Sequence, residues 1–374
     1  MKPKFFFFGS FDPFTRFDFN VVLSLMSNGG FSEGFIAIDV DYSKQNIFSL
    51  RAREEMIEAT LKWYDNLYKT DYYSRVKVVS FSGVPVYKAM QLEATTLVTM
   101  ENHNKAVVSS AIARSMFDYS LNIDDISFMF ENEFATDNSD VSDTVRFLYL
   151  NREYIMLQRY LTPAVHNMVM AMALKDEYLE CCRGSYISWD DFVSVVGSRS
   201  YHNLSHIAYM LNRYRFYQKK VFSPEQHFQN LNFKAAIFFH DYVANNEVKS
   251  FEYSRLSDKS KGLFLATKHG AGASENLSDT EQLISYLDLA ILADDFLYND
   301  YKAGIRMEYA DVSYEDYAIG RIKVLDELTK EVENSKRFGE SEKKRACKNL
   351  ATEKKELQKQ LFKIKLRKFF SRKK

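Results

Sequence analysis

Short apolar runs, separated by polar or glycine-containing breaks, mark the first part of the chain up to about residue 155. Such runs, with helical patterns between them, are typical of buried strands that alternate with helices. This alternation predicts a parallel sheet with helices packed against it. The expected strands are Phe5–Phe8, Phe35–Val40, Arg75–Phe81 and Thr95–Met100, with Ile126–Phe130 and Val145–Leu150 as further candidates. The expected helices are Val21–Met26, a helix that Ser49 caps and that runs through Trp63, and Val84–Leu92.

A different pattern governs the rest of the chain. Strand patterns stop after about residue 155, and apolar residues recur at helical spacing from about 188 to 335, as in Ile207, Met210 and Leu211. The segment Lys175–Asp191 is polar and lacks clear periodicity, so we place a domain boundary there. We therefore expect an α/β domain over residues 1–175 and an all-helical domain over residues 185–355.

The C-terminal end of the chain is charged. Residues 341–368 have the periodicity of a surface helix or of a helix that forms an oligomer. Between residues 361 and 374 there are seven Lys or Arg and no acid, which defines a basic tail over 356–374. Such a tail suits contact with an anionic lipid or nucleic acid, or else a solvated or oligomer-packing helix end. These alternatives, including a homo-oligomer, stay open.

The composition is that of a folded chain with two domains. Its 374 residues exceed one ordinary domain, and 46% hydrophobic residues can form a sizeable core. Gly and Pro are few, at 13 and 5, which favours regular structure over loops. Lys and Arg total 50, as do Asp and Glu, so the net charge gives no global case for nucleic-acid or membrane binding.

Location is suggested by what the sequence lacks. No stretch reaches the roughly 18 apolar residues of a transmembrane helix, and the apolar run near Met1 is too short for a signal peptide. Cys181 and Cys182 are adjacent, a placement that rarely allows pairing, and no metal-like spacing links them to Cys347. We expect reduced thiols and a cytoplasmic protein.

Histidines and aspartates gather in the expected helical domain. His202 and His206 stand four residues apart, which on a helix would put them on one face. His240 and Asp241 follow an apolar run that predicts a buried helix ending at this pair. Asp288 lies in an otherwise apolar helical segment, where a charge is costly unless it is paired or bound to a metal.

Two imidazoles and two carboxylates form a mixed nitrogen and oxygen ligand set. Such a set suits Zn²⁺, Mn²⁺, Fe²⁺ or Mg²⁺. A bound divalent ion lowers the pKa of a water molecule and polarises a phosphoryl oxygen. Each residue alone fits a plain structural role, such as a core histidine or a helix cap. The hypothesis of a divalent-metal cofactor therefore depends on the residues acting together.

The pattern His…His-Asp…Asp in an all-helical domain resembles the HD phosphohydrolase superfamily. The stretch Tyr201–His206 is similar to the corresponding motif of the cyclic nucleotide phosphodiesterases, in which the first histidine acts as an acid and the second binds metal. Over roughly residues 188–355 the chain also resembles a group of bacterial proteins described as predicted metal-dependent HD phosphohydrolases. These resemblances imply that His202 is a catalytic general acid and that the metal ligands are His206, His240, Asp241 and Asp288.

Three more residues are candidate catalytic groups. The resemblance places Glu247 near the metal, where it would orient water or hold contacts behind the ligands. The alternative is a surface carboxylate in a polar loop. Lys268 and His269 would contact phosphate or a second metal ion, and for each the alternative is a plain structural role.

The segment Gly9–Thr15, after the first expected strand, resembles the nucleotide-binding loop of the phosphopantetheine adenylyltransferases and related nucleotidylyltransferases. The resemblance covers roughly residues 4–160 and implies a Rossmann-like parallel sheet. The expected fold class is thus multidomain, with an N-terminal α/β Rossmann-like sheet and a C-terminal all-α HD domain. Ser10 and Lys44 match nucleotide-binding positions of that family, and Arg16 would supply a positive charge from a new direction.

The departures from that family concern its catalytic groups. Asp18 stands where the family has a histidine that stabilises the transferring phosphate, and a carboxylate would repel it. Met100–Asn104 lacks the family's arginine, and Ile155–Gln158 replaces its serine-rich segment. We expect a domain that kept the fold and lost adenylyl transfer, with either a retained nucleotide site or a purely structural role.

The leading hypothesis is a metal-dependent phosphohydrolase or phosphodiesterase that acts on a nucleotide or a nucleotide-derived coenzyme. The nucleotide preference follows from the neighbouring domain and from fold-level analogy. A nucleotidylyltransferase with an altered N-terminal site is one alternative. A nucleotide sensor that binds without turnover is the other.

Overall fold

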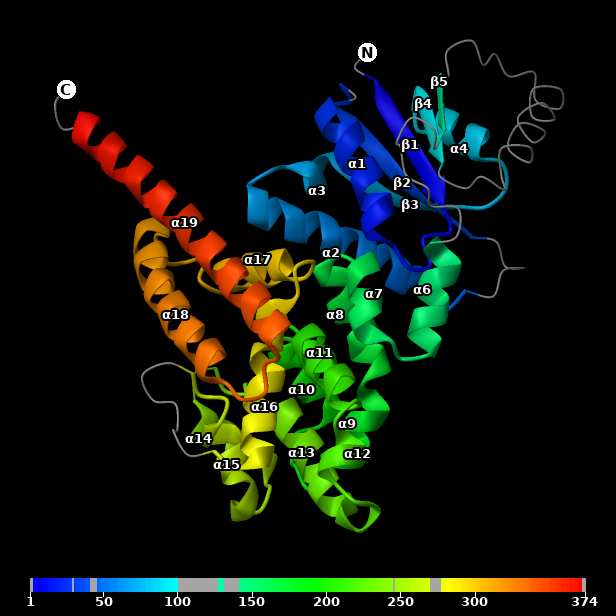
Figure 1. The fold of residues 1–374 in the computed structure, drawn as a ribbon. Coiled ribbons are helices and arrows are strands. Elements are labelled where there is room, and N and C mark those ends of the chain that lie inside the picture. The colour runs from blue at the N-terminus through cyan, green and yellow to red at the C-terminus, as the bar shows by residue number, and fades with distance from the viewer. Residues whose placement is uncertain are drawn as a thin grey trace. The chain divides into compact units, whose positions relative to one another are not determined.

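A computed structural model describes residues 3–28, 30–40, 46–99, 127–130, 141–244, 246–269 and 277–371. The chain divides into two compact units, residues 1–168 and 169–374 (Figure 1). The division falls shortly before the polar segment Lys175–Asp191, at which the sequence places a domain boundary. Within that segment the structure has a short helix rather than a loop alone.

The N-terminal unit is built on a parallel sheet with the strand order β3-β2-β1-β4-β5. The chain moves outward from the central strand to β3 and then returns to pair β4 with the other edge of β1. This order makes a topological switch point between β1 and β4, the place where open α/β sheets usually bind ligands. The strands are β1 (Lys4–Gly9), β2 (Glu33–Asp39), β3 (Val76–Phe81), β4 (Thr96–Thr99) and β5 (Ser127–Phe130).

The four phenylalanines of β1 explain why helices cover both faces of this sheet. Phe5 and Phe7 pack with apolar residues of α1 and α2 on one face. Phe6 and Phe8 pack with residues of α4 on the other. Gly34 of β2 lies under the ring of Phe5, where an added Cβ would come within 2.1 Å of a ring carbon. The helices of this unit are α1 (Arg16–Asn28), α2 (Leu50–Tyr68), α3 (Tyr72–Arg75), α4 (Pro85–Gln91), α6 (Val141–Leu150), α7 (Tyr154–Tyr160) and α8 (Pro163–Ala173), which crosses into the second unit.

Most sequence predictions for this unit are confirmed, including the Rossmann-like sheet and the cap of α2. The Ser49 side chain accepts a hydrogen bond of 3.2 Å from the backbone N–H of Ala52. The candidate strand Val145–Leu150 is wrong, because the segment belongs to the helix α6. Its buried residues, Val145 and Leu148, are three apart, and so short an apolar run does not distinguish a strand from a helix.

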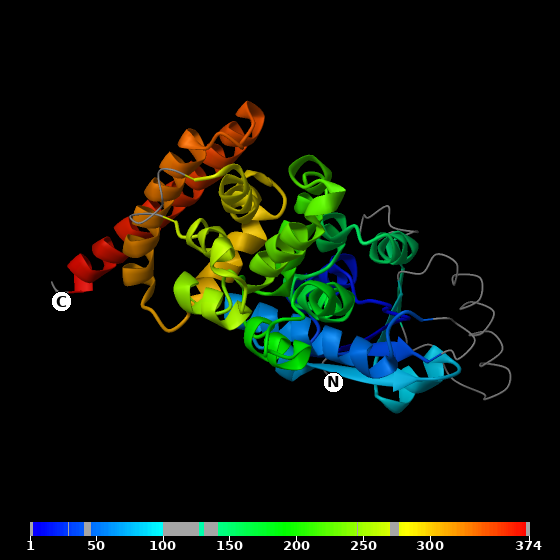
Figure 2. The same ribbon diagram turned by 90° about the horizontal axis from the view of Figure 1, so that it is seen from below.

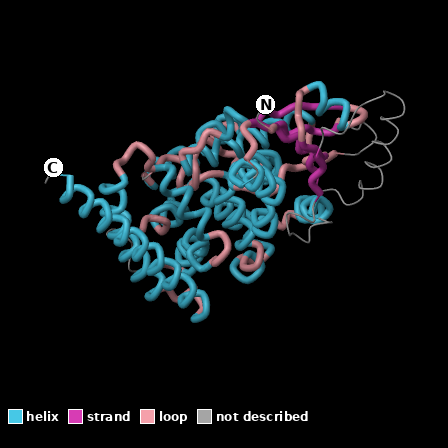
Figure 3. Tube along the Cα trace, turned by 90° about the horizontal axis from the view of Figure 1, so that it is seen from above, coloured by secondary structure: helices cyan, strands magenta, loops and turns pink. Residues whose placement is uncertain are grey.

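Every regular element in the described part of the second unit is helical, as Figure 3 shows. Figures 1 and 2 show α18 and α19 side by side. The expected charged helix is confirmed as part of α19, which carries the basic tail as far as Ser371. Among the described helices, none is both long and apolar enough to cross a membrane. The helices are α9 (Lys175–Cys181), α10 (Trp189–Val196), α11 (Leu204–Tyr214), α12 (Gln218–Val221), α13 (His227–Phe239), α14 (Glu247–Ser254), α15 (Lys261–Leu265), α16 (Asp279–Leu289), α17 (Tyr298–Glu308), α18 (Tyr314–Asn334) and α19 (Glu340–Ser371), with short 3₁₀ turns at Pro224–Gln226, Asp258–Ser260 and Ala290–Ala293.

A buried ion pair ties α18 to α19. The Arg321 Nε atom lies 2.8 Å from Glu353 Oε1, and both side chains are almost fully buried. Two hydroxyls of α17 complete the cluster: Tyr298 donates to Glu353 over 2.6 Å, and Tyr301 accepts from Arg321 over 2.8 Å. Because buried charges without partners are strongly destabilising, this cluster fixes the three helices against one another.

His166 makes the stability of the N-terminal unit depend on pH. Its side chain is fully buried in α8, and its Nε2 donates to the carbonyl oxygen of Tyr154 over 3.1 Å. Burial lowers the pKa of His166 to about 3. Below pH 6.5 the unfolded chain therefore binds a proton that the folded chain does not. The free energy of unfolding should fall by about 1.4 kcal/mol per pH unit between pH 6.5 and 3 from this residue.

Urea unfolding at pH 7 and pH 5 tests this prediction. In a Trp189→Phe background, fluorescence of Trp63 reports on the N-terminal unit, since the chain has two tryptophans. The His166→Gln variant keeps a donor for Tyr154 and cannot take up a proton. Its loss of stability between the two pH values should be smaller than that of the parent by roughly 2 kcal/mol. Equal losses would show that His166 is not the group responsible.

Candidate metal centre

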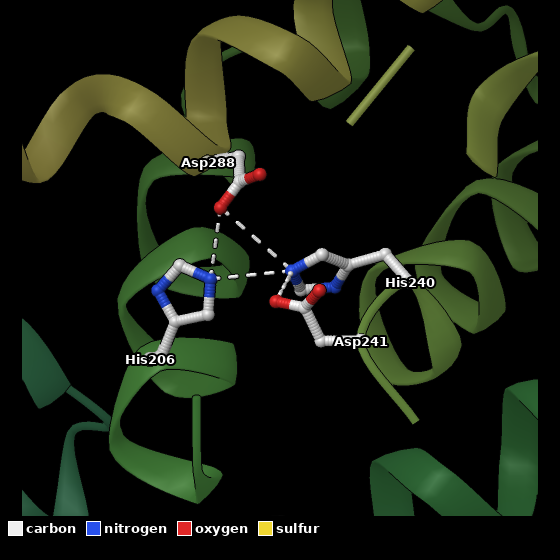
Figure 4. Close-up of side chains that lie close together, drawn as sticks. All are labelled: His206, His240, Asp241 and Asp288. Carbon is white, nitrogen blue, oxygen red and sulfur yellow. Dashed lines mark hydrogen bonds and ion pairs between the residues drawn. The ribbon is translucent and has the colours of Figure 1, made fainter. Parts of the chain in front are cut away.

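Four side chains converge between three helices of the second unit (Figure 4). His206 projects from α11, and Asp288 from the last turn of α16. His240 and Asp241 directly follow α13, whose last residues form the buried apolar run predicted from the sequence. Asn203 starts α11 by accepting a hydrogen bond of 2.9 Å from the backbone N–H of Ser205. Local capping and apolar burial thus bring the functional groups to one point.

The four groups lie at distances that allow shared coordination. One ligand atom from each residue lies within 4.8 Å of the others. His206 Nε2 is 3.0 Å from Asp288 Oδ1 and 3.2 Å from His240 Nε2. His240 Nε2 is 2.9 Å from Asp241 Oδ2 and 3.7 Å from Asp288 Oδ1. Both histidines are almost fully buried, so bulk water does not compete for their nitrogens.

The outward nitrogens of the two rings fix their orientation. His240 Nδ1 donates to the carbonyl oxygen of Ile237 over 2.8 Å. His206 Nδ1 lies 3.1 Å from the hydroxyl of Tyr201, within hydrogen-bond distance. Histidines that bind metal are commonly held through the other ring nitrogen in this way. Both Nε2 atoms are thereby directed at the two carboxylates.

The electrostatics of this cluster favour a cation. Burial raises the pKa of Asp241 and Asp288, but the nearby histidines outweigh it and hold both carboxyl pKa values below their usual range. Burial lowers the pKa of His206 below its usual value. Burial also lowers the pKa of His240, but Asp241 and Asp288 outweigh burial and raise this pKa well above its usual value. Two ionised carboxylates and two imidazole nitrogens around one buried point fit a divalent metal ion.

His202 is brought to the edge of this cluster, although the predicted placement on the helix of His206 is wrong. The helix begins at Leu204 because Asn203 caps it, so His202 lies in the preceding turn. Its Nε2 is 3.9 Å from Asp241 Oδ2, and its Nδ1 is 2.7 Å from Glu308 Oε2. Burial lowers the pKa of His202, but Asp241 and Glu308 outweigh this effect and raise it above its usual value.

His269 contacts the cluster through Asp288, whereas His202 lies near Asp241. Its Nε2 is 2.9 Å from Asp288 Oδ2, and its Nδ1 is 2.8 Å from Glu331 Oε2. Burial lowers the pKa of His269, but the two carboxylates outweigh it and raise the pKa to about 10. Lys268, predicted together with His269, is exposed.

Glu247 is the first residue of α14 and is half-buried, outside the group of four convergent residues. Its neighbours secure the loop that follows Asp241. Asn246 caps α14, and the hydroxyl of Ser250 accepts a hydrogen bond of 2.9 Å from the backbone N–H of Val243. Arg199 adds a hydrogen bond of 2.7 Å to the carbonyl oxygen of Tyr242. This segment therefore has a structural role in the site.

Sequence reasoning missed Tyr201, Glu308 and Glu331 as parts of this site. The sequence spacing could have identified Glu308. It lies three residues after the buried Ile305 and four after Gly304, and is therefore on the buried face of α17. An acid on such a face needs a partner, by the same argument that drew attention to Asp288. Glu308 satisfies this need by accepting hydrogen bonds of 2.9 Å from the backbone N–H groups of Tyr201 and His202.

The predicted nucleotide-binding residues of the first unit have structural contacts. The backbone carbonyl of Ser10 accepts a hydrogen bond of 2.7 Å from the buried Arg53, in the loop after β1. Arg16 donates to the carbonyl oxygen of Gln158 over 3.3 Å. Lys44 lies outside the described residues. Asp12, which was not predicted, is buried and accepts backbone hydrogen bonds from Ile47 and Phe48.

Asp18 has a defined structural task at the start of α1. Its Oδ2 atom accepts hydrogen bonds of 2.7 Å from both the backbone N–H and the hydroxyl of Thr15. The backbone N–H of Asp18 in turn donates to Thr15 Oγ1 over 3.2 Å. This reciprocal pair is a capping box. A negative charge therefore already occupies the N-terminus of the helix that follows the β1 loop.

Comparisons with known proteins bear on the N-terminal region. It is similar to the phosphopantetheine adenylyltransferase of Francisella tularensis subsp. mediasiatica, with 30% identity over 128 residues, which cover 34% of this chain and 66% of that enzyme. The enzymes of subsp. novicida and subsp. tularensis are 36% identical over 90 residues, or 24% of this chain and 49% of each enzyme. The chain thus spans about half to two thirds of these relatives' length. No family model matches the chain.

Metal content tests the ligand assignment. The purified protein should hold one or two divalent ions per chain, and Asp241→Ala should lose much of this metal because it removes an anionic ligand. Elemental analysis after dialysis measures the content. His227→Ala is the matched control, since His227 is an exposed histidine outside the cluster. Equal metal in the parent and Asp241→Ala would overturn the assignment.

Proposed function

We propose that the C-terminal unit is a metal-dependent phosphohydrolase of the HD type. It would hydrolyse a phosphoester or phosphoanhydride bond of a nucleotide or a nucleotide-derived coenzyme. The observation that carries the proposal is the convergence of His206, His240, Asp241 and Asp288 within 4.8 Å at one largely buried point. The acid His202 at the edge of this point supports it further.

The four converging residues would hold the ion, whose bound form supplies Lewis-acid chemistry by polarising a phosphoryl oxygen and lowering the pKa of water. Zn²⁺, Mn²⁺, Fe²⁺ and Mg²⁺ all suit two imidazoles with two carboxylates. The chain's own part is to keep the ligands in place. Tyr201 and the carbonyl of Ile237 do this for the two histidines.

His202 would deliver a proton to the leaving oxygen. Glu308 accepts from Nδ1, so a hydrogen stays on that nitrogen and the proton to be delivered is carried on Nε2. Nε2 lies 3.9 Å from Asp241, too far for a hydrogen bond, and is therefore available to a substrate oxygen. Glu308 also binds the backbone of the turn, which aims the ring. General acid catalysis of this kind needs such positioning.

The choice of a nucleotide substrate is supported by the first unit. Its region is similar to enzymes that are named for transferring an adenylyl group. A unit with that similarity, joined to a hydrolase in one chain, suggests that the two units share a class of ligand.

A second candidate function, nucleotidyl transfer by the first unit, is favoured by that same similarity. We infer instead that this unit kept a nucleotide-binding fold but lost adenylyl transfer. Asp18 replaces the expected imidazole, and its carboxylate is committed to capping Thr15. A sensor that binds nucleotide without turnover is a third candidate, and binding without hydrolysis at full metal content would support it.

Paired variants test the roles of the two neighbouring histidines. His202→Ala should keep its metal and lose turnover by roughly 10²–10⁴-fold, because a proton donor is missing while the ligands remain. His206→Ala should lose both metal and turnover. A metal-supplemented screen of nucleotides and coenzymes for phosphate or nucleoside release identifies the substrate, on which both variants are then compared.

The opposite metal contents would reverse the assignment. Metal lost from His202→Ala but retained in His206→Ala would make His202 the ligand. Full turnover in both variants would remove this site from consideration as the hydrolytic centre.

The first unit should release no pyrophosphate from ATP and phosphopantetheine, since a carboxylate near the transferring phosphate opposes charge development there. The full chain is assayed with magnesium, in the parent and in the Asp241→Ala variant, which silences hydrolysis by the second unit. Robust pyrophosphate release that persists in Asp241→Ala would show that adenylyl transfer survives.

A further inference from the structure

We propose that Glu331 is a positioning residue that holds Asp288 in its metal-binding orientation by acting through His269. The inference rests on the proposed function, because it explains these contacts by the needs of the metal site. It assigns a role to a residue in α18, a helix that contributes no ligand to the group of four.

The two oxygens of Asp288 have different partners. Oδ1 lies 3.0 Å from His206 Nε2 and faces the cluster, whereas Oδ2 lies 2.9 Å from His269 Nε2. A carboxylate without the second contact could rotate about its side-chain bond and present either oxygen. Holding Oδ2 therefore decides which oxygen reaches the metal and at what angle.

His269 needs support of its own to perform this task. It lies beyond the end of α15, so helical hydrogen bonds do not fix its backbone. Its Nδ1 is 2.8 Å from Glu331 Oε2, and its Nε2 faces Asp288. With a carboxylate at each nitrogen, the ring is placed to donate on both sides. Because both ring nitrogens are engaged, neither is left to bind a second metal ion or a phosphate, which are the roles that the sequence suggested for His269.

Glu331 is carried by a rigid element. It lies in the last turn of α18, which the buried pair Arg321–Glu353 fastens to α19. The contact with His269 is largely shielded, since the side chains of His269 and Glu331 are 22% and 19% exposed. A charge-assisted hydrogen bond in such surroundings is stronger than one in water.

The pair Glu308–His202 on the other side of the cluster provides a contrast. Each glutamate holds a histidine that faces a metal-binding aspartate. His202 Nε2, however, is 3.9 Å from Asp241, whereas His269 Nε2 is 2.9 Å from Asp288. The ring of His202 is held by Glu308 but makes no hydrogen bond to Asp241. The ring of His269 is held by Glu331 and is within hydrogen-bond distance of Asp288. The geometry therefore separates a proton donor from a positioning residue.

Mn²⁺ binding to the full-length protein tests the proposal without any substrate. Isothermal titration compares the parent with Glu331→Ala, Glu331→Gln, His269→Ala and the double variant Glu331→Ala/His269→Ala. The single alanine variants should bind Mn²⁺ about 10–100-fold more weakly. This is the usual effect on metal affinity of removing a group that hydrogen-bonds to a metal ligand or to its partner. The double variant should bind no more weakly than His269→Ala alone, because Glu331 acts through His269. Glu331→Gln keeps an acceptor and should bind more tightly than Glu331→Ala.

Glu333→Ala is the matched control, because Glu333 is an exposed acid in the same turn of α18. It should bind Mn²⁺ like the parent. Circular dichroism checks folding, and the near-isosteric Glu331→Gln carries the test if Glu331→Ala does not fold, with weaker binding than the parent as its expected result. Parent-like affinity in Glu331→Ala, or additive losses in the double variant, would overturn the inference.

Mn²⁺ binding to His206→Ala distinguishes a failure of this inference from a failure of the proposed metal site. Weak binding in His206→Ala with parent-like binding in Glu331→Ala would defeat this inference alone. Parent-like binding in His206→Ala would defeat the proposed metal site, and this inference with it.

Discussion

The meeting of two carboxylates and two imidazoles at one largely buried point is the constraint on which the second unit depends. Charges withdrawn from water must find partners, and here the partners come from α11, from the two residues directly after α13 and from α16. Two further helices, α17 and α18, bring the glutamates that hold the outer histidines. The long helix α19 closes the arrangement through its buried pair with Arg321. The helical fold can thus be understood as a support for one cluster of charge.

Much of this architecture could be predicted where a residue's neighbours in sequence decide its environment. The apolar run of phenylalanines in β1, the cap at Ser49 and the aspartate in the apolar stripe of α16 are of this kind. Pairings across the fold could not be predicted. Glu308 lies 106 residues from His202, and Glu331 lies 62 from His269, so no local pattern joins them. Asn203 moved the start of α11 past His202 because a cap outweighed the helical spacing.

The first unit shows how one side chain can serve either chemistry or architecture. The capping box of Thr15 and Asp18 satisfies backbone donors that a bound phosphate could otherwise engage. A carboxylate in that place complements the positive end of the helix without any ligand. In this region, which is similar in sequence to the adenylyltransferase relatives, Thr15 and Asp18 stabilise the start of α1.

The central position of β1 also affects how the chain is made. Phe5–Phe8 are synthesised before the other strands of the sheet. β2 follows within a few tens of residues, but β4, which pairs with the other edge of β1, begins only at Thr96. At ordinary rates of translation the open edge and its phenylalanines wait roughly 5–20 s for that partner. During this interval the nascent chain exposes an apolar strand of the kind that chaperones bind and that aggregates most readily.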